Sequence, residues 1–142
     1  MQQHIDFLMQ HLVTEGFRAE LDGDGDILFK CEGLRYALCF DASDAAFGKL
    51  ILANVWQIDS AAELQLALTE LNILNRRLKV VKGHTQGDQV WFTVELLLDR
   101  QAGWATYLQR CVRGLSHAMG LFAERMRDGT RAQLAGAGQT IN

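Results

Sequence analysis

Residues 27–40 read Ile-Leu-Phe-Lys-Cys-Glu-Gly-Leu-Arg-Tyr-Ala-Leu-Cys-Phe, and this stretch decides the fold class. Two runs of alternating apolar side chains flank Glu32 and Gly33, a two-residue spacing that is typical of a tight β-hairpin. A turn there pairs Phe29 with Tyr36 and gathers the apolar side chains on one face. A slip of one residue would turn that whole set toward water, so the register is well specified.

Further strands extend this hairpin on both sides. Residues 17–21 alternate in the same way, and a three-residue loop at 23–25 keeps their apolar side chains on the common face. On the other side we expect a loop over residues 41–48 and a fourth strand over 49–58. The first half of the chain therefore predicts four consecutive strands.

Three helices and a second hairpin complete the pattern. Apolar residues recur at helical spacing over residues 3–15, over 61–78, where Ser60 and Glu63 form a capping box, and over about 100–127, where Asp99 can cap the helix. The second hairpin spans residues 79–98. For the second helix, the predicted core stripe consists of Leu64, Ala67, Leu68, Leu71, Leu74 and Leu78.

The order of these elements predicts an α+β fold, α-ββββ-α-ββ-α, with three helices packed on a twisted, mainly antiparallel sheet. A chain of 142 residues is the size of one domain. We expect that domain to span residues 1–128. Asp128 and Gly129 are expected to end the third helix, and residues 129–142, rich in Ala, Gly and Gln, to form a flexible tail.

The composition indicates an ordinary globular protein of the cytoplasm. Apolar residues make up 49% of the chain and charged residues 22%. No apolar run approaches the roughly 20 residues that span a bilayer, and no secretory signal precedes the first helix. The three cysteines contain no CxxC pair, which favours buried thiols in a reducing compartment. We expect no membrane association.

No group of residues has the spacing of a catalytic or metal site. Asp22, Asp24 and Asp26 resemble a calcium loop, but Ile27 and Gly33 occupy the positions where an EF-hand needs its Gly and its bidentate Glu. We interpret this segment as a hairpin turn rather than a weak cation site. The four histidines are not spaced as ligands of one zinc ion. We therefore predict a protein that is not an enzyme, with no catalytic residue, metal or cofactor.

Basic residues gather where the second helix meets the fifth strand, at Arg76, Arg77, Lys79 and Lys82. Stacking aromatic residues are not interleaved with them and the whole chain carries a net charge of −3, so we expect a solvated helix end and no nucleic-acid partner. Asn75 lies near the apolar stripe of this helix. We expect its amide to bond backbone groups at the helix end or at a sheet edge.

Several of these segments together resemble a known bacterial family. They are Gly16-Phe17, residues 24–29 (Asp-Gly-Asp-Ile-Leu-Phe), residues 71–75 (Leu-Asn-Ile-Leu-Asn), the long third and fourth strands, and the closing helix. The chain resembles the YbjN-type sensory transduction regulators and, more distantly, class I type III secretion chaperones of the CesT type. The resemblance covers about residues 3–127. It implies a dimeric α+β protein without catalytic residues, whose chaperone relatives wrap an extended segment of another protein.

The leading hypothesis is a homodimeric regulator or chaperone-like adaptor that buries a segment of an unidentified protein partner. The residues predicted to bind it lie off the main apolar faces: Leu66, Ile73, Trp91 and Leu97. Core packing of Leu66 and Ile73 within the chain stays an alternative. A second hypothesis is a small-ligand sensor with a pocket between sheet and helices, lined by Trp56, Phe92 and Trp104. A third is a structural subunit that associates only with its own copy.

Overall fold

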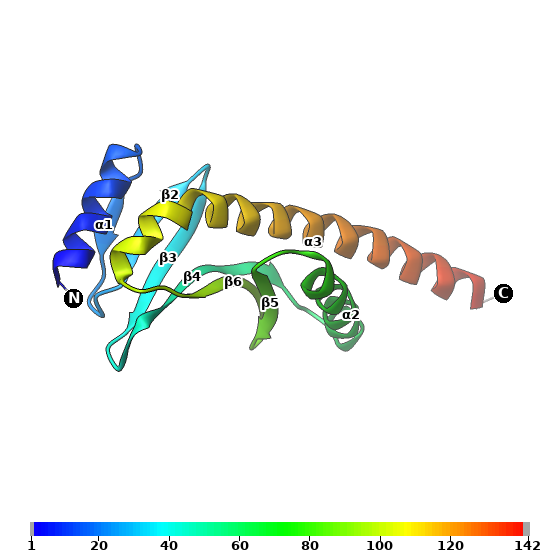
Figure 1. Ribbon diagram of the computed structural model, residues 1–142. Coiled ribbons are helices and arrows are strands. Elements are labelled where there is room, and N and C mark those ends of the chain that lie inside the picture. Colours follow the sequence, from blue (N-terminus) through cyan, green and yellow to red (C-terminus); the bar gives the residue numbers. More distant parts are fainter. Residues whose placement is uncertain (1, 141–142) are drawn as a thin grey trace.

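The computed structural model describes residues 2–140, with the side chains of residues 2–136. Its elements confirm the predicted α+β order (Figure 1). They are α1 (Gln2–Thr14), β1 (Ala19–Leu21), β2 (Ile27–Cys31), β3 (Leu34–Asp41), β4 (Asp44–Gln57), α2 (Ala61–Arg77), β5 (Val81–Gln86), β6 (Gln89–Leu97), a 3-10 turn (Gln101–Gly103) and α3 (Trp104–Thr140).

All six strands form one sheet in the order β1-β2-β3-β4-β6-β5, and every neighbouring pair is antiparallel. The predicted hairpin registers are confirmed, because Phe29 lies opposite Tyr36 and Leu21 lies opposite Ile27. The sheet twists strongly between its β1–β3 part and its β4–β6–β5 part (Figure 1).

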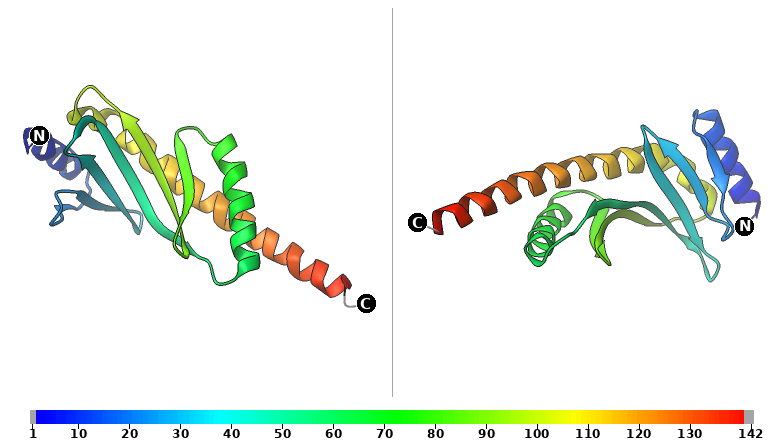
Figure 2. Two further views of the ribbon diagram at one scale, coloured as in Figure 1. Left: turned by 90° about the horizontal axis from the view of Figure 1, so that it is seen from below. Right: turned by 180° about the vertical axis from the view of Figure 1, so that it is seen from behind.

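Helices α1 and α3 cover one face of the sheet, and α2 lies beside β5 (Figures 1 and 2). The core between them is continuous and well packed. Phe122 of α3 stands edge-on against both Trp56 and Phe92, with ring centroids 5.9 and 5.7 Å apart. The largest side chains that are fully buried there are Trp104, Tyr36, Phe92, Phe122, Leu8 and Leu12.

The loop predicted over residues 41–48 is wrong. Asp41 caps a short turn by accepting hydrogen bonds from the Ser43 amide and hydroxyl at 2.8 and 2.6 Å, and β4 begins at Asp44. Gly48 therefore lies inside a strand. A Cβ atom there would collide with the indole of Trp104. Glycine lowers strand propensity, which made this segment resemble a loop, but here its missing side chain admits an aromatic ring.

The predicted core stripe of α2 is also partly wrong. Leu64 and Leu68 are 38% and 46% exposed, whereas Leu66 is half-buried. The helix is rotated about its axis because α3 packs against the flank that carries Leu66 and Glu70. The carboxylate of Glu70 pairs there with the Arg125 guanidinium.

Both ends of α3 differ from the prediction. A 3-10 turn without a side-chain cap precedes it, so Asp99 is not its cap, and the helix continues past Gly129 to Thr140. A Cβ atom at Gly129 would lie 2.6 Å from Leu66 Cδ1. The glycine thus fits a close approach of the two helices instead of ending one. Residues 129–140 are helical, and 141–142 lie outside the described residues.

Asn75 closes the free edge of the sheet at β5. Its Oδ1 accepts a hydrogen bond from the Gly83 amide at 2.7 Å, and its Nδ2 donates to the Gly83 carbonyl at 3.0 Å. The expectation that this amide bonds a sheet edge is confirmed. Because these backbone groups of an edge strand are satisfied within the chain, partner pairing at this point of the edge is blocked.

Candidate functional site

The candidate site is the face of the sheet that points away from α1 and α3, which we call the open face. Seen from that side, the strands lie in front of α3 and no described helix crosses them (Figure 2, left). Side chains on this face follow the registers of the five strand pairs. They form parallel rows across the sheet, two residues apart along each strand, which corresponds to about 7 Å.

The middle row of the open face is apolar at its centre. Leu28 lies opposite Ala37, Ala37 opposite Ile51, and Ile51 opposite Thr93. Leu28, Ala37 and Ile51 are each half-buried although no helix covers them. Charged residues end the row, with Glu20 on β1 and Lys82 on β5. A band of partly accessible apolar surface therefore runs across the three strands β2, β3 and β4, and ends at Thr93 of β6, which is fully buried.

A cationic row lies on one side of this band. Lys30 of β2 is directly opposite Arg35 of β3, and Arg18 immediately precedes β1. All three side chains are exposed, and none lies within 4.0 Å of a carboxylate among the described residues. Like charges directly opposite one another on neighbouring strands are destabilising. The fold thus carries an unfavourable pair that has no carboxylate of the described residues within 4.0 Å.

These two rows enclose a hollow of about 490 Å³. Its polar rim consists of Arg18, Glu20, Lys30 and Arg35, and its floor includes Leu28, Ala37, Ile51 and Ala53. The volume lies within the range of roughly 300–1,000 Å³ that is usual for ligand pockets. An apolar floor beside uncompensated cations is chemically suited to a molecule with both apolar and anionic groups.

The opposite side of the band is ionic but internally paired. Glu95 of β6 accepts a hydrogen bond from Lys82 at 2.7 Å, and Lys49 lies 3.8 Å away. The Lys82 hydrogen bond holds the pKa of Glu95 below its ordinary value. Near the β2 end of this row, burial and the neighbouring Asp26 carboxylate raise the pKa of the Cys39 thiol to about 12. Cys39 is therefore an unreactive thiol at neutral pH.

Two of the four residues predicted to bind a partner lie on the open face. Trp91 and Leu97 belong to β6 and point the same way as Thr93. Leu97 is 74% exposed, and the Trp91 indole donates a hydrogen bond to Asn54 Oδ1 at 2.9 Å. Asn54 has a positive φ of 55° in an irregular stretch of β4, so this contact is built on a strained backbone.

The other two, Leu66 and Ile73, lie on α2 and are not brought together with Trp91 and Leu97. Leu66 packs toward α3 beside Gly129, which agrees with the alternative of core packing, and Ile73 is half-buried. The structure thus separates the predicted set into a helix pair and a sheet pair. Only the sheet pair shares a face with the hollow.

The pocket predicted between sheet and helices is filled instead. Trp104 is 1% exposed and Phe92 is fully buried, and Phe122 packs against Phe92 and Trp56. The hollow on the open face is lined by none of the three residues predicted to line the pocket. The reason is that aromatic and aliphatic side chains of α3 fill the space between the sheet and the helices where the pocket was predicted.

The aspartate turn forms the compact structure expected of a hairpin. Asp22 Oδ1 accepts hydrogen bonds from the amides of Asp24 and Asp26, both at 2.9 Å. The carboxylates of these three residues also lie within 4.8 Å of one another. This proximity follows from the turn itself. Burial, followed by the neighbouring aspartates, raises the pKa of Asp26 above its ordinary value.

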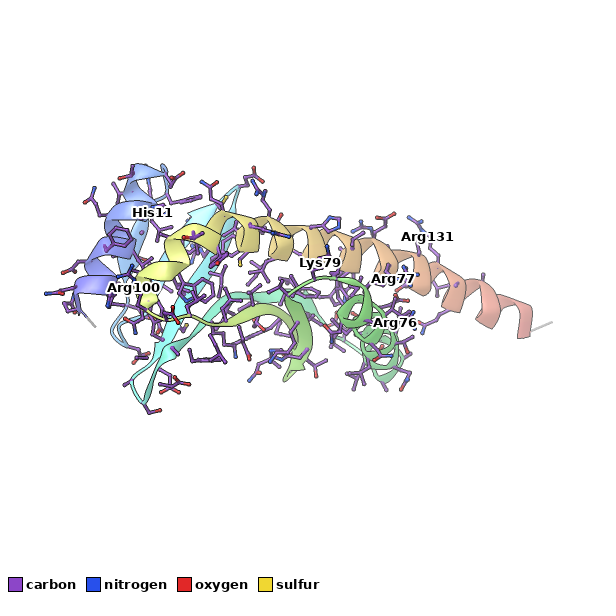
Figure 3. The ribbon with its side chains drawn as sticks, in the orientation of Figure 1. His11, Arg76, Arg77, Lys79, Arg100 and Arg131 are labelled. Atoms are coloured by element: carbon purple, nitrogen blue, oxygen red, sulfur yellow. The ribbon has the colours of Figure 1, made fainter. Side chains whose placement is uncertain are left out.

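The basic cluster at the end of α2 is divided by the fold. Arg76 and Arg77 occupy the last turn of α2, and Lys79 follows that helix near the middle of the view, below α3 (Figure 3). Lys82 instead lies on the open face and pairs with Glu95. The four cations therefore do not form one surface.

Sequence reasoning missed Ile51 and Ala53 as site residues and noted Leu28 only as an exception on a polar face. A signal was present in residues 50–53, Leu-Ile-Leu-Ala, which are apolar on both faces of the strand. Such a run is typical of a strand covered on both sides. No helix of the described chain provides the second cover.

Comparisons with known proteins add no assignment to this geometry. No family model matches the chain, and no curated protein matches it. No helix within residues 2–140 has both the length and the apolar character that crossing a bilayer requires.

Proposed function

We propose that this protein is a non-catalytic, cytoplasmic protein-binding module that buries an extended segment of a partner protein on its open face. The observation that carries the proposal is the apolar band of Leu28, Ala37 and Ile51, which forms part of the floor of a hollow of about 490 Å³. Burying one large aliphatic side chain in such a hollow contributes about 1.5–3 kcal/mol.

The proposed biological role is that of a sensory transduction regulator or chaperone-like adaptor. The resemblance to YbjN-type regulators and CesT-type chaperones supports this role, and the observed order of helices and strands is compatible with it. We further propose a homodimer. The exposed pair Leu64 and Leu68 on α2 supports a self-association surface, because these leucines lie one turn apart on one side of the helix.

The test is selection of binders from a random peptide library on the immobilised protein. We expect an enriched pool that binds the wild type and loses binding to Ile51→Lys, because a charge would occupy the apolar floor. The matched control is Val13→Lys on α1, which changes an exposed apolar residue away from the open face. Thermal melts of both variants show whether a loss of binding results from unfolding of the protein. A library that yields no binder, or a pool insensitive to Ile51→Lys, contradicts the proposal.

A small-ligand sensor is the second candidate function. The volume of the open-face hollow favours it, since the hollow is large enough for a metabolite. A thermal-shift screen with a metabolite panel tests it. The expected result is a hit whose stabilisation disappears in Ile51→Lys, and a screen without hits counts against the sensor.

A further inference from the structure

We infer that the hollow on the open face recognises an acidic segment, in which a carboxylate side chain lies two residues from a large apolar side chain. This inference rests on the proposed function and specifies the chemistry of the partner. Its starting point is the cationic row of Arg18, Lys30 and Arg35, which lines the hollow.

The distribution of charge makes this row unusual. Residues 1–60 contain ten acidic and only four basic residues. Three of those four basic residues, Arg18, Lys30 and Arg35, line the hollow, and the fourth, Lys49, lies beside Glu95. Scattered surface charges would not concentrate in this way. In an acidic half of the chain, the hollow is a local basic site.

The fold itself does not use these cations. Lys30 and Arg35 face each other across β2 and β3 with Cβ atoms about 5 Å apart, a spacing at which like charges repel. Glu20, which also lines the hollow, lies more than 4.0 Å from any basic side-chain nitrogen of the described chain. An opposite charge placed by a partner would relieve this repulsion, which is the charge complementarity that identifies the occupant.

The spacing of the rows determines the pattern of the segment. The cationic and apolar rows are two residues apart along each strand, or about 7 Å. In an extended peptide, side chains on one side recur at the same distance. A glutamate over Lys30 and Arg35 therefore places the side chain two residues away over Leu28 and Ala37.

The experiment measures fluorescence anisotropy of a labelled synthetic peptide in which glutamate and leucine alternate, with serine between them. Matched peptides carry glutamine or lysine in place of glutamate. We expect the glutamate peptide to bind roughly tenfold more tightly than the glutamine peptide, as two or more exposed ion pairs provide. That preference decreases from about 0.1 M to about 1 M salt, because the Debye length falls from about 10 to 3 Å.

Two variants test whether the preference for the glutamate peptide arises in the hollow. Lys30→Glu and Arg35→Glu should each abolish the preference for glutamate. Lys30→Glu should also raise Tm by about 1–4 °C, because it creates an opposite-charge pair with Arg35. The matched control is Arg76→Glu, which makes the same change of charge on α2 away from the hollow (Figure 3). It should leave the preference intact.

Several outcomes overturn the inference. Equal affinity for the glutamate and glutamine peptides does so, as does a loss in Arg76→Glu equal to that in Lys30→Glu. Octanoate that displaces the peptide and binds as tightly would assign the hollow to a small carboxylate instead. Library binders without enrichment of acidic residues overturn this inference and leave the proposed function standing, whereas an empty library overturns both.

Discussion

The two faces of the sheet are built from the same six strands but have opposite properties. On the covered face, side chains such as Leu38, Leu50 and Phe92 are almost fully buried, and Trp104 occupies the space that Gly48 leaves. On the open face, apolar side chains remain half-buried, and Lys30 faces Arg35 with no carboxylate of the described residues within 4.0 Å. Stability is therefore concentrated on one face, and the other keeps unfavourable features that a partner can relieve.

The largest expected effect lies on the covered face, at Gly48. Gly48→Ala places a methyl group against the Trp104 indole, and we expect a loss of about 3 kcal/mol in the free energy of unfolding. Urea denaturation measures it. Gly120→Ala is the control, because a Cβ there meets nothing and alanine favours the helix by roughly 1 kcal/mol. Equal stability of the two variants would contradict close packing on this face.

A smaller loss is expected at the edge of the sheet. Asn75→Ala removes both hydrogen bonds to Gly83 and exposes an edge strand, which should cost about 1–2 kcal/mol and increase aggregation. Thermal melts with light scattering follow both effects. Asn72→Ala is the matched control, since that exposed side chain makes no hydrogen bond among the described residues. An Asn75→Ala protein as stable as this control would show that the edge contact is weak.

On the open face the expected change in stability is smaller and has the opposite sign. Lys30→Glu should increase the free energy of unfolding by about 0.2–1 kcal/mol, because a repulsive cross-strand pair becomes attractive. Urea denaturation at low salt measures the gain, and high salt should reduce it. A destabilised variant would mean that Lys30 contributes to the fold and that the contrast between the faces is overstated.

The smallest effect on stability at neutral pH is expected at Cys39, whose thiol pKa is raised from 9.0 to about 12 by burial and by Asp26. The neutral thiol is favoured in the folded state. Its contribution to stability is therefore complete below about pH 9 and is lost as the pH rises toward 12. Iodoacetamide at pH 8 should modify Cys39 at least tenfold more slowly than an exposed thiol.

Asp26→Asn should accelerate that modification by removing the neighbouring charge, without unfolding the protein. Peptide mapping separates Cys39 from Cys31 and Cys111. Rapid modification of Cys39 in the wild type would show that this end of the open face is not buried as described.

The sequence alone determined the order of the helices and strands, the hairpin registers of β1 to β3 and the α+β class. These features depend on neighbours along the chain: alternation over residues 27–40 sets the register, and Ser60 begins α2 by accepting a hydrogen bond from the Glu63 amide at 3.1 Å. The Asn75 amide was also expected to bond backbone groups at the helix end or at a sheet edge, and it bonds Gly83 at the edge. Local chemistry was sufficient in each case, because the interacting groups are either close in sequence or fixed by a side-chain period.

Only the tertiary structure decided which apolar residues are covered. Leu64 and Leu68 became exposed and Leu66 became half-buried because α3 packs on one flank of α2. In the sequence, Gly48 resembled part of a loop and Gly129 resembled the end of a helix. In the structure, the side chain of Trp104 packs against Gly48 and that of Leu66 packs against Gly129. The open-face hollow arises from the register of β1 to β4 and from the absence of any described helix over it. Contacts between distant segments set these features, and no periodicity within one segment encodes them.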